Sequence, residues 1–141
     1  MNQSFHYVGC FFSANELLEI LKPYRSNPLA RTISRPHVTF IYKPDEVDES
    51  LFGIDIHVTI TGYGNDGRNE GVKVSLSSEH PVLQSMIEKI EVPHITISVG
   101  EGAEPVNTRY LDFVSIPDIQ ITGKYGGCLE SREVILQKGT S

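Results

Sequence analysis

Pro36-His37-Val38-Thr39-Phe40 and Pro93-His94-Ile95-Thr96-Ile97 are two copies of one short pattern, in which a proline precedes His-x-Thr inside an apolar run. Alternate residues of a strand point to opposite faces, so the histidine and threonine of each copy share one face. The aliphatic residue between them points the other way, into a core. Two such strands would place two imidazoles and two hydroxyls on one surface. That arrangement suits acid–base chemistry on a phosphate.

The elements before the two copies follow the same order. A strand at residues 5–12 and a helix opened by Ser13, with Glu16 completing a capping box, precede the first copy. A strand at residues 72–78 and a helix with Pro81 in its first turn precede the second. The chain therefore repeats one strand–helix–strand unit.

The rest of the chain reads as strands joined by turns. Residues 54–60 alternate apolar and polar side chains and predict the clearest strand. We expect further strands at 110–116, 119–122 and 133–137, a loop at 100–108, a turn at 62–71 and a glycine-rich corner at 123–127.

Together these elements predict an α+β fold in one domain, residues 1–141. Each half contributes a strand, a helix, a motif strand and another strand, so we expect a bilobal, pseudo-symmetric arrangement with antiparallel-rich sheets. Both helices would lie on the outer, convex side. The concave face would be free for a ligand.

The charge composition of the chain limits the classes of partner that it is expected to bind. The chain carries 12 Lys+Arg against 18 Asp+Glu, a formal net charge of −6. Proteins that hold long duplexes neutralise phosphates with basic patches, so a nucleotide or an RNA end is the better candidate substrate. No signal peptide is apparent and no apolar run approaches the roughly 18 residues of a membrane span. We expect a cytoplasmic monomer without membrane contact, in which Cys10 and Cys128 are reduced thiols.

Two other motifs do not carry the function. His57-Val58-Thr59 is a third His-x-Thr, but it lacks a leading proline and lies in the middle of the strand at 54–60. We interpret its histidine and threonine as solvent-facing strand residues. Residues 62–67 match the glycine pattern of dinucleotide-binding loops, but no helix begins there to meet a pyrophosphate.

The chemistry of the paired motifs follows from their side chains. Histidine has an unperturbed pKa of about 6.5, so it gives or takes a proton near neutral pH. With one on each side of a phosphorus, His37 and His94 would act as base and acid. The hydroxyls of Thr39 and Thr96 would donate to non-bridging phosphate oxygens. No metal or other cofactor is needed, and a zinc site would require three or four ligands at suitable spacing.

Three further residues are secondary candidates for substrate contact. Tyr7 lies on the strand face opposite Val8, which is the concave face if Val8 is in the core; a tyrosine at a sheet edge is the alternative. Ser98 shares a face with the second motif by alternation. Tyr125, next to Lys124, lies in the glycine-rich corner, where a plain turn is the alternative.

The pattern resembles the 2H phosphoesterase superfamily, whose members carry two His-x-Thr/Ser motifs on the central strands of a bilobal α+β fold. The resemblance covers most of the chain and includes residues 5–9, both motif copies and the helix order. Residues 104–108 look like the loop that follows the second motif in the cyclic phosphodiesterase domains of fungal and plant tRNA ligases. The resemblance implies reaction at 2′,3′-cyclic phosphates, 2′-5′ linkages or related nucleotide diesters. It also implies that the two histidines are the base–acid pair and that the two threonines bind the phosphate.

Two alternatives stay open at this point. Some viral members of the superfamily hydrolyse cyclic dinucleotide or oligonucleotide signals, and this chain could do the same. It could also bind a nucleotide through the same face without cleaving it. A purely structural role would leave the two polar motifs without a purpose.

Overall fold

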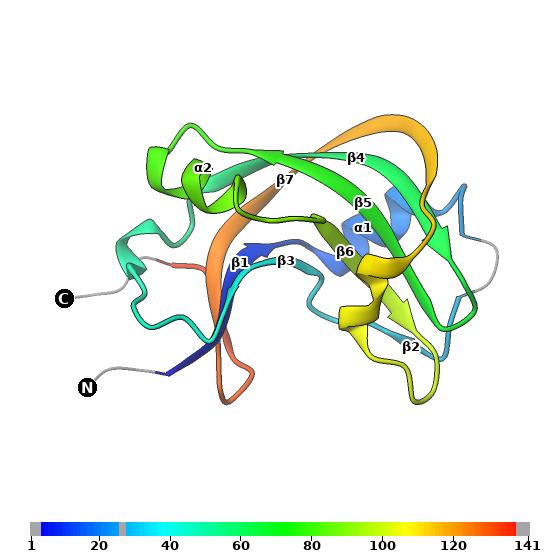
Figure 1. The fold of residues 1–141 in the computed structure, drawn as a ribbon, viewed down its shortest axis with the longest axis horizontal. Helices are drawn as coiled ribbons and strands as arrows, with labels where there is room; N and C mark the ends of the chain where they lie inside the picture. Colours follow the sequence, from blue (N-terminus) through cyan, green and yellow to red (C-terminus); the bar gives the residue numbers. More distant parts are fainter. Residues whose placement is uncertain (1–3, 26–27, 138–141) are drawn as a thin grey trace.

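The computed structural model describes residues 4–25 and 28–137. Its elements are β1 (Phe5–Phe11), α1 (Ala14–Leu21), β2 (Arg31–Thr32), β3 (His37–Tyr42), η1 (Glu49–Leu51), β4 (Asp55–Asn65), β5 (Asn69–Ser77), α2 (Pro81–Ile87), β6 (His94–Val99), η2 (Pro105–Tyr110), β7 (Val114–Leu129) and β8 (Val134–Ile135). The strands form one antiparallel sheet in the order β2-β6-β5-β4-β7-β1-β3, with β8 paired to β7 (Figure 1). The fold class is therefore α+β, as predicted.

The strand–helix–motif strand unit occurs twice. In the first unit β3 pairs antiparallel with β1 after α1, and in the second β6 pairs antiparallel with β5 after α2. The strands that follow the two units, β4 and β7, pair with each other in the middle of the sheet. Each motif strand therefore lies near one end of the strand order (Figure 1).

Both helices begin where the sequence predicts. The Ser13 hydroxyl accepts a hydrogen bond from the Glu16 backbone N–H, which caps α1, and Pro81 occupies the first turn of α2. The cap of α2 is the His80 side chain, which the sequence did not indicate. Neither helix, nor any other helix in the described ranges, is long and apolar enough to cross a membrane. The helix residues buried in the core are Leu17, Leu21, Leu83 and Ile87.

The middle residues of the two motifs anchor their strands. Val38 is 1% exposed and Ile95 is fully buried, which confirms that they point into the core. Along β4 the alternation also holds, because Ile56, Val58 and Ile60 are buried while His57 is exposed. The third His-x-Thr is thus part of an ordinary half-buried strand.

The predicted turn at 62–71 is too long. β4 continues to Asn65 and β5 starts at Asn69, so the turn covers only residues 66–68. Gly67 has a φ of +86° in this turn, and the Asp66 carboxylate accepts hydrogen bonds from two backbone N–H groups. Gly62 and Gly64 serve a different purpose, because a Cβ on either would press against residues 111–113. These two glycines allow close packing inside a strand.

The prediction of a glycine-rich corner at 123–127 is wrong. β7 runs without a break through this segment and through Pro117. A Cβ on Gly123 would lie 2.3 Å from Cys10 Sγ, and one on Gly127 would lie 2.5 Å from the Phe5 ring. Gly123 and Gly127 make room for the neighbouring β1 strand. Pro117 lies where the register between β4 and β7 shifts, so its missing N–H does not break a regular ladder.

Candidate active site

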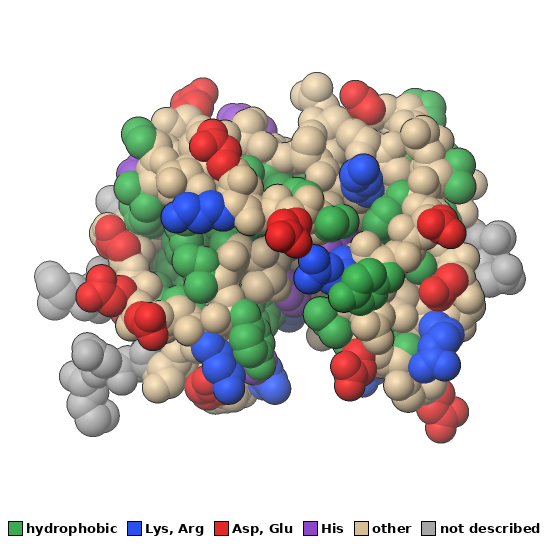
Figure 2. All heavy atoms as spheres, viewed as in Figure 1, with side chains coloured by type: hydrophobic (Ala, Val, Ile, Leu, Met, Phe, Trp, Pro, Cys, Tyr) green, Lys and Arg blue, Asp and Glu red, His purple; other side chains and the backbone are tan. Residues whose placement is uncertain are grey.

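A cleft of about 960 Å³ is lined by both motif copies. His37 and Thr39 reach it from β3, His94 and Thr96 reach it from β6, and Tyr7 reaches it from β1. Figure 2 shows histidine side chains deep in the hollow near the middle of the molecule, with a basic side chain beside them. The four motif residues and Tyr7 are thus brought together in one place.

The two imidazoles are held in the same way. His37 Nδ1 lies 3.0 Å from the carbonyl oxygen of Arg35, and His94 Nδ1 lies 2.8 Å from that of Val92. A carbonyl only accepts, so we assign the hydrogen to Nδ1 in each ring, which leaves Nε2 as the acceptor in the neutral form. A proline separates each pair of partners. The proline has a fixed φ and imposes an extended backbone on the residue before it. These two constraints set the direction of the carbonyl that holds the histidine.

The surroundings favour neutral imidazoles. Burial lowers the pKa of His37, the hydrogen bond to the Arg35 carbonyl opposes this, and the nearby His94 lowers the pKa further. Burial also lowers the pKa of His94, with the Val92 carbonyl opposing and the Arg109 charge adding to the decrease. Because a proton on His94 affects His37, protonating one ring makes protonation of the other less favourable.

The His37 ring is packed between side chains of β1. It stacks on Tyr7, with ring centroids 4.4 Å apart at an interplanar angle of 21°, and contacts Phe11 at 5.6 Å. The Tyr7 hydroxyl lies 3.3 Å from His37 Nδ1, where it shares the Nδ1 hydrogen with the Arg35 carbonyl. Tyr7 therefore fixes the tilt of the imidazole, whereas the Arg35 carbonyl sets its tautomer.

The two motif threonines differ in their surroundings. The Asn69 amide donates to Thr108 Oγ1 at 3.1 Å, the hydroxyls of Thr108 and Thr96 are 2.9 Å apart, and Thr96 donates to the Pro105 carbonyl at 3.1 Å. Asn69 and Thr108 are buried. The Thr39 side chain makes no hydrogen bond to another described residue and is exposed. Only Thr96 is thus oriented by a chain of buried donors, which we call the Thr96 relay (Asn69, Thr108 and Thr96).

Two arginines also line the cleft, and the sequence does not predict them. Arg109, from η2, lies near His94, and its Nη2 donates to Glu91 Oε2 at 3.2 Å. Arg132, from the turn before β8, lies near Tyr7. Among the described residues that line the cleft, Glu91 is the single acid. A chain of net charge −6 therefore has a cleft that favours an anion. No periodicity or motif marks the two arginines, since Arg109 lies in a short 3-10 helix and Arg132 lies in a turn.

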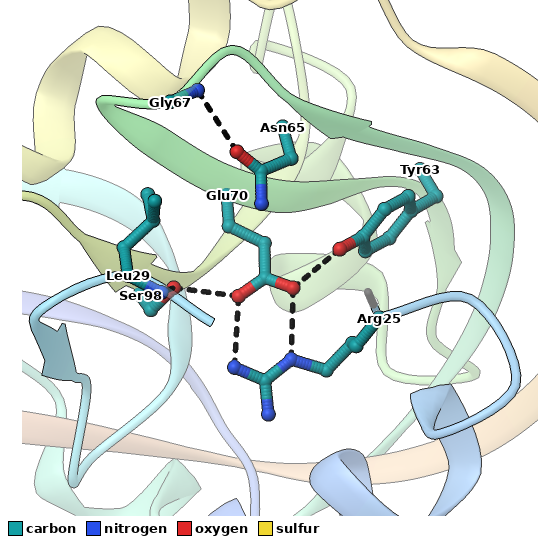
Figure 3. Close-up of polar contacts among 7 residues, drawn as sticks. All are labelled: Arg25, Leu29, Tyr63, Asn65, Gly67, Glu70 and Ser98. Atoms are coloured by element: carbon teal, nitrogen blue, oxygen red, sulfur yellow. Dashed lines mark hydrogen bonds and ion pairs between the residues drawn. The ribbon is translucent and has the colours of Figure 1, made fainter. Parts of the chain in front are cut away.

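Ser98 lies outside the cleft, although alternation places it with the second motif. It is fully buried, and its hydroxyl donates to Glu70 Oε1 at 2.5 Å (Figure 3). Ser98 pairs with Glu70 and Thr96 pairs with Gly71, so Ile97 is an extra residue between them. This β-bulge breaks the strict alternation of β6 and turns the serine toward the Glu70 carboxylate.

Tyr125 also lies outside the cleft. It is 2% exposed and packs on Phe40 and Phe52, with ring centroids 5.9 and 5.6 Å away. Burial raises its pKa to about 12. Because β7 runs straight through the expected corner, the tyrosine faces the core. The neighbouring Lys124 is exposed and pairs with Asp55 at 2.7 Å.

Comparison with known proteins finds no family model, no curated protein and no solved structure that matches this chain. The described residues include no group of three or more His, Cys, Asp or Glu side chains placed to hold a metal ion.

Proposed function

We propose that this protein is a metal-independent phosphodiesterase that hydrolyses a 2′,3′-cyclic phosphate or a small nucleotide or oligonucleotide phosphodiester. One observation carries the proposal: two proline-led histidines, each held through Nδ1, line one cleft, and neither Nε2 is hydrogen-bonded to another described residue, which leaves it for proton transfer. The basic side chains of the cleft supply the charge that a phosphate needs.

The reaction needs one neutral and one protonated ring. The neutral imidazole takes a proton from water as the water oxygen bonds to phosphorus, and the imidazolium gives its proton to the alkoxide as the bond from phosphorus to that oxygen breaks. The proton positions are then reversed, and exchange with solvent resets them. Hydroxyl and guanidinium donors stabilise the charge on the non-bridging oxygens. His37 and His94 are the pair, with Thr39, Thr96 and Arg109 as donors; on binding, Thr96 turns its single hydroxyl hydrogen from the Pro105 carbonyl to the phosphate.

The finer features of the expected fold belong to the same proposal. A bilobal, pseudo-symmetric arrangement is supported by the repeated strand–helix–motif strand unit. Helices on the outside and a concave active-site face are supported by the cleft lining, because none of the described lining residues comes from α1 or α2. We also propose that the protein is cytoplasmic and that it works as a monomer. The monomer is supported by the cleft, because this chain alone supplies both of its histidines.

A substrate panel in excess EDTA tests the function. It contains nucleoside 2′,3′-cyclic phosphates, 2′-5′ oligoadenylates and cyclic dinucleotides, with products separated by chromatography. We expect turnover of at least one class, unchanged by EDTA. Turnover of cyclic dinucleotides alone would select the signal-hydrolase alternative. Binding with no product after long incubation would select a non-catalytic binding module and overturn the proposal.

The pH optimum of kcat/KM should lie on the acid side of neutrality. Both histidines have pKa values below 6.5 in the free protein, and one must be protonated to act as the acid. We therefore expect kcat/KM to reach its maximum below pH 6.5 and to fall as the pH rises, because the acid loses its proton. The measurement is a kcat/KM profile from pH 4 to 9 at constant ionic strength. A plateau extending above pH 7.5 would contradict the assignment of the acid.

The Thr96 relay makes a second prediction. Thr108→Val keeps the side-chain shape but removes the hydroxyl that hydrogen-bonds to Thr96, so kcat should fall about tenfold, the value of one hydrogen bond. Thr108→Ser should retain most of the activity. The effects of Thr108→Val and Thr96→Val should be strongly non-additive in kcat, as expected for residues acting through one donor. Fully additive losses would show that Thr108 only supports the fold.

A further inference from the structure

An aromatic row leads away from His37 along one wall of the cleft. The His37 ring stacks on the Tyr7 ring. The ring centroids of Tyr7 and His6 are 5.7 Å apart, and those of His6 and Tyr42 are 4.8 Å apart in an edge-to-face arrangement. All four side chains line the cleft. Tyr42 is 59% exposed, so the row ends in an aromatic ring that solvent can reach. The proposed hydrolysis uses His37 from this row and leaves His6 and Tyr42 without a role.

Two β-bulges are what turn His6 and Tyr42 into the cleft. In the β1–β7 pair, Phe5 is opposite Leu129 and Tyr7 is opposite Cys128, so His6 is an extra residue. In the β1–β3 pair, Val8 is opposite Ile41 and Gly9 is opposite Thr39, so Phe40 is an extra residue. Without these bulges, alternation would turn His6 away from Tyr7 and Tyr42 away from His37. Bulges that re-aim side chains occur preferentially beside functional sites.

Two cations on backbone of positive φ lie along the row, Lys43 at Tyr42 and Arg132 near Tyr7. Lys43 and Arg132 are the non-glycine residues with positive φ in the described part of the chain, at 50° and 78°. Lys43 Nζ lies 5.7 Å from the Tyr42 ring centroid, and Arg132 lines the cleft. The left-handed conformation is unfavourable for these side chains, and residues held in such strained conformations cluster at active sites and ligand-binding sites. In the Arg132 turn, Glu130 lies 3.5 Å from His6 Nδ1, which places the turn beside the row.

We propose that Tyr42, Lys43 and Arg132 form a subsite for a second nucleotide of the substrate, next to the phosphodiester that the histidines cleave. The base stacks on Tyr42, and the second phosphate binds the two cations. This inference rests on the proposed function, because it places the reacting diester between the two histidines. The volume of about 960 Å³ lies at the upper end of the range of roughly 300–1,000 Å³ for small-molecule sites. The substrate class is therefore a nucleotide with at least two phosphates and two bases, either linear or cyclic.

Calorimetry with three probes tests the subsite. They are adenosine 2′,3′-cyclic phosphate, the dinucleotide ApA ending in a 2′,3′-cyclic phosphate, and cyclic di-AMP, each titrated into the full chain carrying His94→Ala to prevent turnover. We expect at least one dinucleotide to bind ten or more times tighter than the mononucleotide. A preference for ApA would identify linear ends as the substrate, and a preference for cyclic di-AMP would identify cyclic dinucleotides.

Variants of the subsite sharpen the test. Arg132→Gln and Tyr42→Leu, each added to His94→Ala, should remove the tenfold preference and leave mononucleotide binding within twofold. Tyr42→Phe, which keeps the ring, should retain the preference. Equal affinity for all three probes, an equal loss for all three in Arg132→Gln, or no binding of any probe would each overturn the subsite. Absence of turnover in the wild-type chain, with the binding preference intact, would instead overturn the proposed function.

The variant Arg132→Asn tests whether Arg132 binds the dinucleotide or only forms the turn. Asparagine adopts a positive φ more readily than arginine, so the midpoint of thermal unfolding should rise. In the same variant the dinucleotide preference should disappear. A rise in the midpoint with unchanged dinucleotide binding would mean that Arg132 is a turn residue alone, which would contradict its place in the subsite.

Discussion

His37→Ala and His94→Ala should each lower kcat by about 10²–10⁴-fold on any diester that the wild-type protein cleaves, because each removes a proton-transfer group from the transition state. The two rings transfer protons in one step, so losing either ring disables both ends of that step. The double variant should therefore be little slower than the single variants. The measurement is kcat under saturating substrate and excess EDTA. Two single variants with wild-type activity would remove the basis of the proposed reaction.

His57→Ala is the matched control for these variants. His57 belongs to the third His-x-Thr, but it is exposed on β4 and does not line the cleft. The activity of this variant should equal that of the wild type. All variants should keep the same far-UV circular dichroism, so that a loss at His37 or His94 can be assigned to chemistry. A comparable loss in His57→Ala would mean that histidine removal acts through folding.

The motif strands could be predicted because their information is local. A proline, a polar–apolar–polar alternation and a marked helix start before each copy fix the strand position and the face of each side chain. Val38 and Ile95 point into the core and the four motif residues line the cleft, as the alternation requires. The register is unbroken within His-x-Thr, so period-2 reasoning holds there.

Beyond the motifs the alternation fails at the bulges. Phe40 follows Thr39 and Ile97 follows Thr96, each as the extra residue of its strand. The bulge in β3 turns Tyr42 into the cleft, whereas the bulge in β6 turns Ser98 away from it. An inserted residue is visible only against the partner strand, which the local sequence does not identify. Ser98 was therefore placed in the site wrongly and Tyr42 was omitted.

Glycine-rich segments were misinterpreted for a related reason. Residues 123–127 have the composition of a turn, yet they cross the sheet as part of β7. What requires glycine there is the close approach of Cys10 and Phe5, more than a hundred positions earlier in the chain. The relay from Asn69 to Thr96 and the two cleft arginines depend on similarly distant contacts. Such contacts follow from the assembled sheet and leave no local pattern.

The second large effect is expected at a buried ion pair on β5. The Glu70 carboxylate is fully buried and accepts hydrogen bonds from Arg25 Nε at 2.8 Å, a second Arg25 nitrogen at 2.9 Å, Ser98 and the Tyr63 hydroxyl (Figure 3). The Arg25 side chain is 13% exposed. Burial would raise the pKa of Glu70, but the Arg25, Ser98 and Tyr63 donors outweigh it and lower that pKa. Arg25 thereby fastens the segment after α1 to the second unit of the sheet.

Arg25→Met should lower the free energy of unfolding by roughly 3–5 kcal/mol at pH 7, because it leaves a buried carboxylate without its cation. Lys124→Met is the matched control: it breaks a solvent-exposed pair with Asp55, for which little or no loss of stability is expected. Urea unfolding followed by circular dichroism measures both. Similar small losses in the two variants would show that the Arg25–Glu70 pair does not hold the fold together.

The same pair predicts a specific dependence on pH. The folded-state pKa of Glu70 is below its unfolded value of 4.5, so its contribution to stability is complete above pH 4.5 and is lost as the pH falls through the folded pKa. In Arg25→Met, burial without the guanidinium raises the Glu70 pKa instead, and acid neutralises the isolated carboxylate. The stability difference between wild type and Arg25→Met should therefore shrink as the pH is lowered from 7 to 4. A difference that stays constant over this range would mean that the loss comes from packing of the arginine stem, and not from the charge left on Glu70.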